Sequence, residues 1–160
     1  MNSNGKNNSI AVVKQEAGLM KIQFFGSIDE NFEFPSFDKV PALVQLDLSK
    51  VTGINSRGIR DWIDWISRFI NTRLELHQCP KLIIDQINMV DGFLPSNGKV
   101  LSFFVPYYND ENGSEKNVLY KYGQEFSEGT VTPPAKVVDD SGAEMEMDVI
   151  ESKYFKFIKK

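Results

Sequence analysis

The chain has 160 residues, of which 41% are hydrophobic and 12% aromatic, enough for a folded core in one domain or in one domain with an appendage. Its 22 acidic and 18 basic side chains give a formal net charge of -4, which argues against binding to nucleic acid or to an anionic membrane. The single cysteine, Cys79, excludes an internal disulfide and a zinc site built from cysteines. The chain has no apolar run of about 18 residues, and the opening MNSNGKNNSI lacks the apolar stretch of a secretory signal. These features predict a cytoplasmic protein.

The first predicted elements are a disordered lead-in and a β-hairpin. Residues 1–9 are rich in asparagine, serine and glycine, a composition typical of disorder. The apolar runs 10–14 and 19–25 are separated by a short turn that contains a glycine, which predicts two antiparallel strands. Residues 26–41 carry three phenylalanines among acidic residues and predict an irregular connection that packs on the core.

A strand and a helix follow this connection. Residues 43–48 form a nearly continuous apolar run, typical of a strand covered on both faces. Residues 58–71 have helical periodicity, and at 100° per residue the apolar side chains fall on one broad face. Trp65 falls at the border of that face, so part of its ring is expected to be exposed. The opposite face carries Arg60, Asp61 and Asp64.

The order of the remaining elements predicts an α/β fold. A strand at 74–79, a helix at 81–90 that starts after a proline, and a strand at 100–108 alternate along the chain. Such alternation produces a mixed sheet with parallel pairs and helices packed against it. We therefore expect one domain at 10–108, followed by a small β-rich C-terminal extension at 109–160.

A short motif lies where the strand at 43–48 leads into the next helix. It consists of Asp47-Leu48-Ser49, Val51 and Ile54-Asn55-Ser56-Arg57-Gly58-Ile59. Either Asn55 or Ser56 can cap the helix with a side-chain oxygen, and the N–H groups at a helix start tolerate a phosphate. The stretch resembles the motif of the STAS domain, the fold of the anti-sigma factor antagonists, whose pattern is roughly D-L-S-x-V-x-x-I-D-S-[ST]-G-[LIV]. The order of elements over 10–108 is similar as well.

This resemblance implies a non-catalytic bacterial signalling module that binds a protein partner of the anti-sigma factor and serine kinase class, with a phosphatase as a further partner. In the family the motif serine is the phosphoacceptor, and Ser56 occupies that position. Two residues depart from the pattern, because Asn55 replaces an aspartate and Arg57 a second serine or threonine. A role of Ser56 as a helix cap alone stays open. The partner-binding residues implied are Asn55, Arg57, Arg60, Asp61, Asp64 and Trp65.

The C-terminal extension has a second, shorter resemblance. Two turns, 109–113 and 138–142, have the length of a zinc knuckle and end in glycine. The extension thus resembles a zinc ribbon without its cysteines, because the four ligand positions carry other residues and no metal is expected. Two ordinary turns rich in asparagine, aspartate and glycine explain the same residues. The four positions are Asn109, Asn112, Val138 and Ser141.

The sequence predicts neither an enzyme nor a cofactor. It contains no phosphate-binding, dinucleotide-binding, zinc-protease or nucleophile-elbow motif. His77 and Cys79 would share one side of a strand, but no third group that orients them is identifiable. Two other functions stay open. One is a STAS domain that senses a nucleotide or another small molecule, and the other is a structural homodimer with Trp65 and the aromatic tail in its interface.

Overall fold

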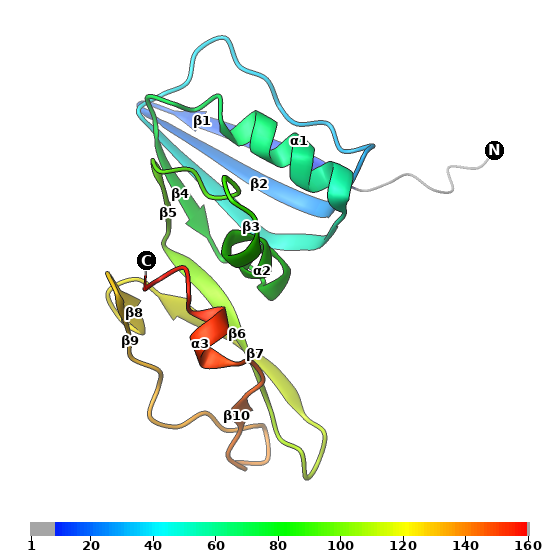
Figure 1. The fold of residues 1–160 in the computed structure, drawn as a ribbon, viewed down its shortest axis with the longest axis vertical. Helices are drawn as coiled ribbons and strands as arrows, with labels where there is room; N and C mark the ends of the chain where they lie inside the picture. The colour runs from blue at the N-terminus through cyan, green and yellow to red at the C-terminus, as the bar shows by residue number, and fades with distance from the viewer. Residues whose placement is uncertain (1–8, 160) are drawn as a thin grey trace, which may run out of the picture. The chain divides into compact units, whose positions relative to one another are not determined.

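The computed structural model describes residues 9–159, and the chain forms two compact units (Figure 1). The N-terminal unit comprises Met1–His77 and Gly92–Lys99, and the C-terminal unit comprises Gln78–Asp91 and Val100–Lys160. The sequence placed a boundary after residue 108, whereas the C-terminal unit here begins earlier. Residues 1–8 of the predicted disordered lead-in lie outside the described part of the chain.

The N-terminal unit is built on a five-stranded mixed sheet in the order β1-β2-β3-β4-β5. β1 and β2 form the predicted antiparallel hairpin, while β2 with β3 and β3 with β4 are parallel pairs. The mixed sheet expected from the alternating elements is therefore confirmed. The strands are β1 (Ile10–Glu16), β2 (Leu19–Ile28), β3 (Leu43–Ile54), β4 (Arg73–His77) and β5 (Gly98–Val100).

β3 differs from its prediction in length and in burial. It continues to Ile54, beyond the end at residue 48 that the apolar run predicts, with shifts of register against β2. Val44, Leu46 and Leu48 are buried, but the alternating positions between them are only partly buried. The prediction of a strand covered on both faces is thus wrong, because only one face of the sheet lies against an apolar core.

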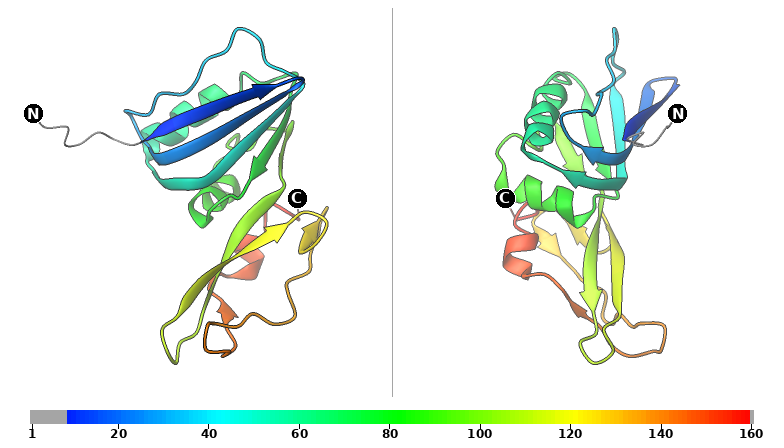
Figure 2. Two further views of the ribbon diagram at one scale, coloured as in Figure 1. Left: turned by 180° about the vertical axis from the view of Figure 1, so that it is seen from behind. Right: turned by 90° about the vertical axis from the view of Figure 1, so that its right-hand side faces the viewer.

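The helix α1 (Ser56–Ile66) lies along one face of the sheet, as the two views of Figure 2 show. It ends earlier than residue 71, where the sequence placed its end, because the chain turns after Ser67. Its apolar side packs into a cluster of aromatic rings, which supplies much of the core of this unit. The cluster contains Phe24, Phe32, Phe34, Trp62, Trp65, Phe69 and Phe93.

Trp65 is buried, with only 4% of its surface exposed. Its ring packs against Phe34 and Phe69, and its Nε1–H donates to the carbonyl oxygen of Pro35 at 2.7 Å. The prediction that part of Trp65 is exposed is wrong, because helical periodicity does not show that the connection between β2 and β3 folds over this residue.

The C-terminal unit is a small α+β unit around a second aromatic core. Its three-stranded sheet has the order β10-β6-β7, and a separate hairpin pairs β8 with β9. Val138 and Glu144 form an isolated bridge, and β10 pairs with β6. The elements are α2 (Lys81–Met89), β6 (Ser102–Tyr108), β7 (Glu115–Lys121), β8 (Phe126–Ser127), β9 (Thr130–Val131), β10 (Glu146–Met147) and α3 (Glu151–Tyr154). None of the helices within residues 9–159 is long and apolar enough to cross a membrane.

Candidate functional site

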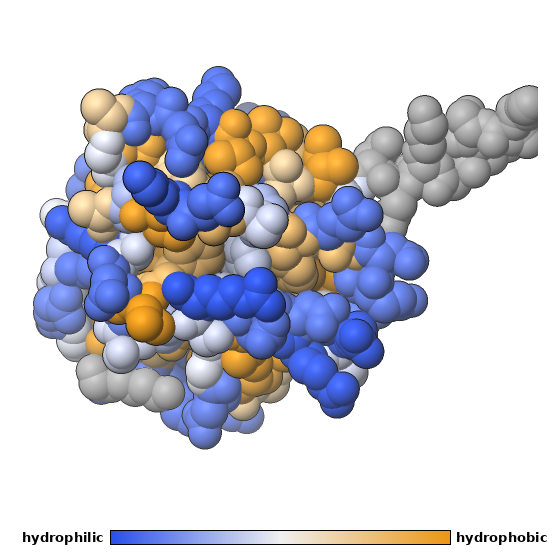
Figure 3. Space-filling model, turned by 90° about the horizontal axis from the view of Figure 1, so that it is seen from above, coloured by the Kyte–Doolittle hydropathy of each residue, from blue (hydrophilic) through white to orange (hydrophobic). Residues whose placement is uncertain are grey.

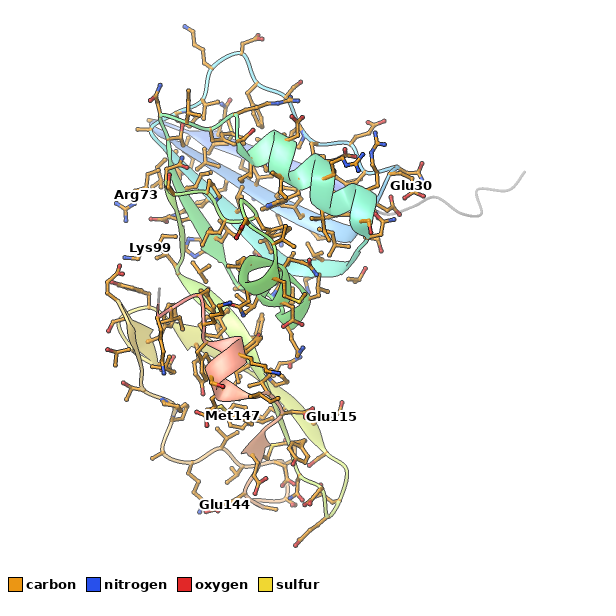
Figure 4. All side chains as sticks on the ribbon, in the orientation of Figure 1. Glu30, Arg73, Lys99, Glu115, Glu144 and Met147 are labelled. Atoms are coloured by element: carbon orange, nitrogen blue, oxygen red, sulfur yellow. The ribbon has the colours of Figure 1, made fainter. Side chains whose placement is uncertain are left out.

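The start of α1 is fixed by the side chain of Asn55. Its Oδ1 accepts a hydrogen bond from the backbone N–H of Gly58 at 2.9 Å, and its Nδ2 donates to Oε2 of Glu30 at 2.8 Å. Its own backbone N–H donates to the carbonyl oxygen of Ile28 at 3.3 Å. Figure 4 shows Glu30 beside this end of the helix. Asn55 is therefore the cap, and of the two residues that could cap the helix, Ser56 is not the one that does so.

Gly58 allows the first turn of α1 to lie directly against the end of β2. A Cβ atom built on Gly58 would be 1.8 Å from the carbonyl oxygen of Ile28, which is a backbone atom and cannot move aside. Only a glycine permits this approach. The glycine of the motif therefore has a steric role, which is to bring the helix start and the strand together.

Ser56 is exposed at the first position of α1. Its hydroxyl group has no hydrogen-bond partner among residues 9–159, in contrast to the side chain of Asn55. The neighbouring Arg57 is also exposed, and its Nε contacts Oδ1 of Asp61 at 3.2 Å, one turn along the helix. An accessible hydroxyl group, an arginine and the N–H groups of a helix start thus lie close together.

Glu30 places a fixed negative charge beside this helix start. The hydrogen bond from Asn55 lowers the pKa of Glu30 below its ordinary value, and a backbone hydrogen bond and the charge of Arg57 act in the same direction. Glu30 is thus ionised at neutral pH and stays ionised at a lower pH than an ordinary glutamate. The surface at this end of α1 therefore carries both signs of charge.

The outward side of α1 is polar. Arg57 pairs with Asp61, and Asp64 pairs with Arg68 at 2.7 Å, both at the (i, i+4) spacing. Exposed pairs of this kind contribute little to stability, so their charges can be exchanged for those of a partner. Five of the six partner-binding residues implied by the motif are at least partly exposed here, and Trp65 is not one of them. Figure 3 shows hydrophilic and apolar residues intermixed on the face that it presents.

The open face of the sheet holds a polar cluster that sequence reasoning missed. The carboxylate of Glu75 is buried, with its side chain 6% exposed. Its Oε1 accepts from Nε2 of Gln45 at 2.9 Å and contacts Nε2 of His77 at 3.2 Å, while its Oε2 is 3.1 Å from Nη2 of Arg73. The spacing of Arg73, Glu75 and His77, two residues apart on one side of β4, is the signal that could have indicated it.

The pKa of Glu75 is lowered although the carboxylate is buried. Burial by itself raises this pKa, but the hydrogen bonds from Gln45 and His77 and the positive charge of Arg73 outweigh it. The cluster is thus a network of satisfied polar groups around one ionised carboxylate. Its members are an amide, a carboxylate, an imidazole and a guanidinium group, from Gln45, Glu75, His77 and Arg73.

In the C-terminal unit the two turns that resemble zinc knuckles lie side by side. The carboxylate of Asp139 joins them, because its Oδ2 accepts from Nδ2 of Asn112 at 2.7 Å and from Oγ of Ser114 at 3.0 Å. Its Oδ1 accepts from the backbone N–H of Ser141 at 2.8 Å and of Ala143 at 3.0 Å. These hydrogen bonds, that from Asn112 foremost, lower the pKa of Asp139 far below its ordinary value. We name this arrangement the Asp139 hub.

Three of the four knuckle positions surround the Asp139 hub. Asn112 and Ser141 bond to its carboxylate directly, and Nδ2 of Asn109 lies 3.5 Å from Oδ2. Val138 forms the neighbouring bridge with Glu144. A hydrogen-bonded carboxylate is therefore what connects the two turns. Within residues 9–159 no three His, Cys, Asp or Glu side chains are arranged to hold a metal ion.

The aromatic tail considered as a homodimer contact is largely buried within the C-terminal unit. Tyr154 and Phe155 pack on Phe103 and are almost fully buried. Trp65 is buried as well, so these rings contribute to the cores of the two units.

No protein-family model, curated protein or solved structure matches this chain. The resemblance to the STAS family therefore rests on the motif residues and on the order of the elements.

Proposed function

We propose that residues 10–108 form a non-catalytic, STAS-type module that binds a protein partner through the start and the outward side of α1. Its partner is a serine kinase of the anti-sigma factor class, and phosphorylation of Ser56 regulates the binding. The contact surface comprises Asn55, Ser56, Arg57, Arg60, Asp61 and Asp64.

The observation that carries the proposal is that Asn55 and Ser56 have different roles at the start of α1. Asn55 alone caps the helix, so the exposed hydroxyl group of Ser56 is available to a kinase without loss of the cap. A serine that was itself the cap would have to give up a structural hydrogen bond before it could be modified.

The surroundings of Ser56 favour a phosphate electrostatically. The N–H groups at the start of α1 and its dipole stabilise negative charge, and Arg57 can form charge-assisted hydrogen bonds to phosphate oxygens. In doing so Arg57 would release Asp61, with which it is paired. Phosphorylation therefore changes the charge pattern of the surface on which a partner would dock.

Mass spectrometry of the full chain, purified from the cells that produce it, tests the proposal. We expect one phosphate on Ser56, its absence in Ser56→Ala, and a co-purifying ATP-binding kinase whose amount falls when Arg60 and Asp64 are both replaced by alanine. Ser96→Ala is the matched control, since Ser96 is an exposed serine outside α1. Two results together would contradict the proposal. They are the absence of phosphate on Ser56 in every growth condition tested, and unchanged partner binding when Arg60 and Asp64 are both replaced by alanine.

A further inference from the structure

The C-terminal unit contains a groove between α2 and the segment 149–156. The groove has a volume of about 610 Å³ and is lined by both elements. It lies outside the N-terminal unit, so an inference about it does not depend on the function proposed above. The residues that matter here are Lys81, Asn88, Met89, Ile150, Lys153 and Lys156.

The two walls of the groove are joined by hydrogen bonds. Nδ2 of Asn88, on α2, donates to the carbonyl oxygen of Tyr154 at 2.9 Å, and Oδ1 of Asn88 accepts from the backbone N–H of Phe157 at 2.9 Å. The hydroxyl group of Tyr154 in turn donates to the carbonyl oxygen of Phe104, on β6. The groove is therefore formed before any ligand binds, which reduces the entropy cost of binding.

Large apolar side chains are exposed at the groove. Met89 is 71% exposed and Ile150 is 62% exposed, one on each wall. Most apolar side chains of this size are buried in the chain, so two of them beside one hollow mark a surface that gains free energy when a ligand covers it. Methionine also adapts its shape to different apolar ligands.

The rim of the groove is cationic although the whole chain is acidic. Lys153 and Lys156 form no ion pair with any residue between 9 and 159, and Lys81 pairs only with Asp85, at 2.7 Å on its own helix. Asp85 is the only acidic residue among those that line the groove. Apolar walls beneath a rim of lysines are complementary to a ligand that carries both aliphatic side chains and carboxylates.

We propose that this groove binds an acidic, amphipathic peptide segment of a partner protein. The aliphatic or aromatic side chains of the peptide cover Met89 and Ile150, and its carboxylates pair with Lys153 and Lys156. A concave site with fixed walls suits a peptide, as in other grooves that bind amphipathic helices. A membrane surface would instead call for apolar side chains that project from a convex face.

Selection from a phage-displayed library of random peptides on the full chain tests this proposal. We expect the selected peptides to be rich in aspartate and glutamate between apolar residues, and to shift the NMR signal of the Met89 methyl group. Replacing both Lys153 and Lys156 by glutamate should weaken their binding at least about tenfold, and Met89→Asp should weaken it further.

Two control variants test whether the loss of peptide binding is specific to the groove. Lys50→Glu changes an exposed lysine of the N-terminal unit, and Ile70→Asp changes an apolar residue of that unit as exposed as Met89. Both should leave peptide binding unchanged. Selected peptides without acidic enrichment, or peptides that bind the groove variants as well as the unchanged chain, would overturn the proposal. A membrane-binding result would overturn it as well. In that result no peptide is selected, the unchanged chain sediments with vesicles of phosphatidylserine and phosphatidylcholine, and the groove variants do not.

Discussion

Asn55 illustrates how one side chain can explain a departure from a family pattern. An aspartate at this position could accept the hydrogen bond from Gly58 just as the amide oxygen does. It could not donate to Glu30, because a carboxylate has no N–H group. The amide at position 55 and the carboxylate at position 30 are therefore chemically matched.

We predict that Asn55→Asp lowers the melting temperature, because it places two carboxylates in contact where a hydrogen bond now exists. Glu30→Gln should restore most of the loss in the double variant, since an amide can donate to the new aspartate. Thermal unfolding of the four chains of this double-mutant cycle measures the coupling. Equal effects of Asn55→Asp with and without Glu30 would show that the two side chains are independent.

Gly58→Ala should destabilise the N-terminal unit by about 3 kcal/mol, because the added methyl group collides with the carbonyl oxygen of Ile28. The matched control is Gly18→Ala in the turn between β1 and β2. Gly18 has a positive φ of 73°, but a methyl group added there would meet no other atom, so its replacement costs about 1 kcal/mol of backbone strain alone. Urea denaturation measures both values, and similar losses would argue against the steric role of Gly58.

At the scale of single elements, the strands and helices could be predicted where the hydrophobic pattern alone determines them. The hairpin of β1 and β2 and the start of α2 follow from local sequence, and the structure agrees with them. The extension of β3 to Ile54 could not be predicted, because residues 49–54 gain their strand pairing from β2 in a shifted register. The early end of α1 likewise depends on contacts that a periodic pattern does not contain.

Trp65→Ala should lower the free energy of unfolding by about 4 kcal/mol, because it leaves a cavity in the aromatic cluster and removes the donor to Pro35. Trp65→Phe should cost less, since it keeps most of the ring volume. Chemical denaturation provides the comparison. If Trp65 were instead an exposed partner contact, the alanine variant would keep its stability and lose only partner binding.

At the scale of the whole molecule, the division into two units was the hardest feature to predict. The sequence assigned residues 81–90 and 100–108 to the first domain because they continue its alternation of strands and helices. In the structure α2 joins the C-terminal unit, where Asn88 bonds to the backbone of Tyr154, 66 residues further along the chain. A contact over such a distance leaves no periodic signal in the sequence. The residues proposed for the candidate site, by contrast, lie within one short segment, 55–64, whose exposure follows from a local helical pattern.

Acid should destabilise the chain through Glu30, Glu75 and Asp139, whose pKa values are all lowered in the folded state. The ordinary pKa is 4.5 for a glutamate and 3.8 for an aspartate. At a pH below these values, the carboxylates bind protons in the unfolded chain that they do not bind in the folded chain. The free energy of unfolding therefore falls as the pH drops through this range, and the stabilisation is fully present above it. Denaturation between neutral pH and pH 3 measures the effect.

Asp139→Asn isolates the contribution of the Asp139 hub to this acid sensitivity. The variant replaces an acceptor by a donor that faces Nδ2 of Asn112, so it should be less stable than the unchanged chain at neutral pH. The difference between the two chains should shrink as the pH falls below 3.8, the ordinary pKa of an aspartate, because Asp139 is then protonated in the unfolded state of the unchanged chain but not in its folded state. A difference that stays constant with pH would show that the charge of Asp139 contributes nothing.

The contacts at the start of α1 also determine what a phosphate on Ser56 would change in the protein. The carbonyl oxygen of Ile28 accepts a hydrogen bond from Asn55 and lies close to Gly58, so the first turn has little freedom to shift. A phosphate would thus alter the local potential without a change of shape. A partner would respond directly to the new charge, by binding or by failing to bind. No conformational change transmitted through the sheet would be required.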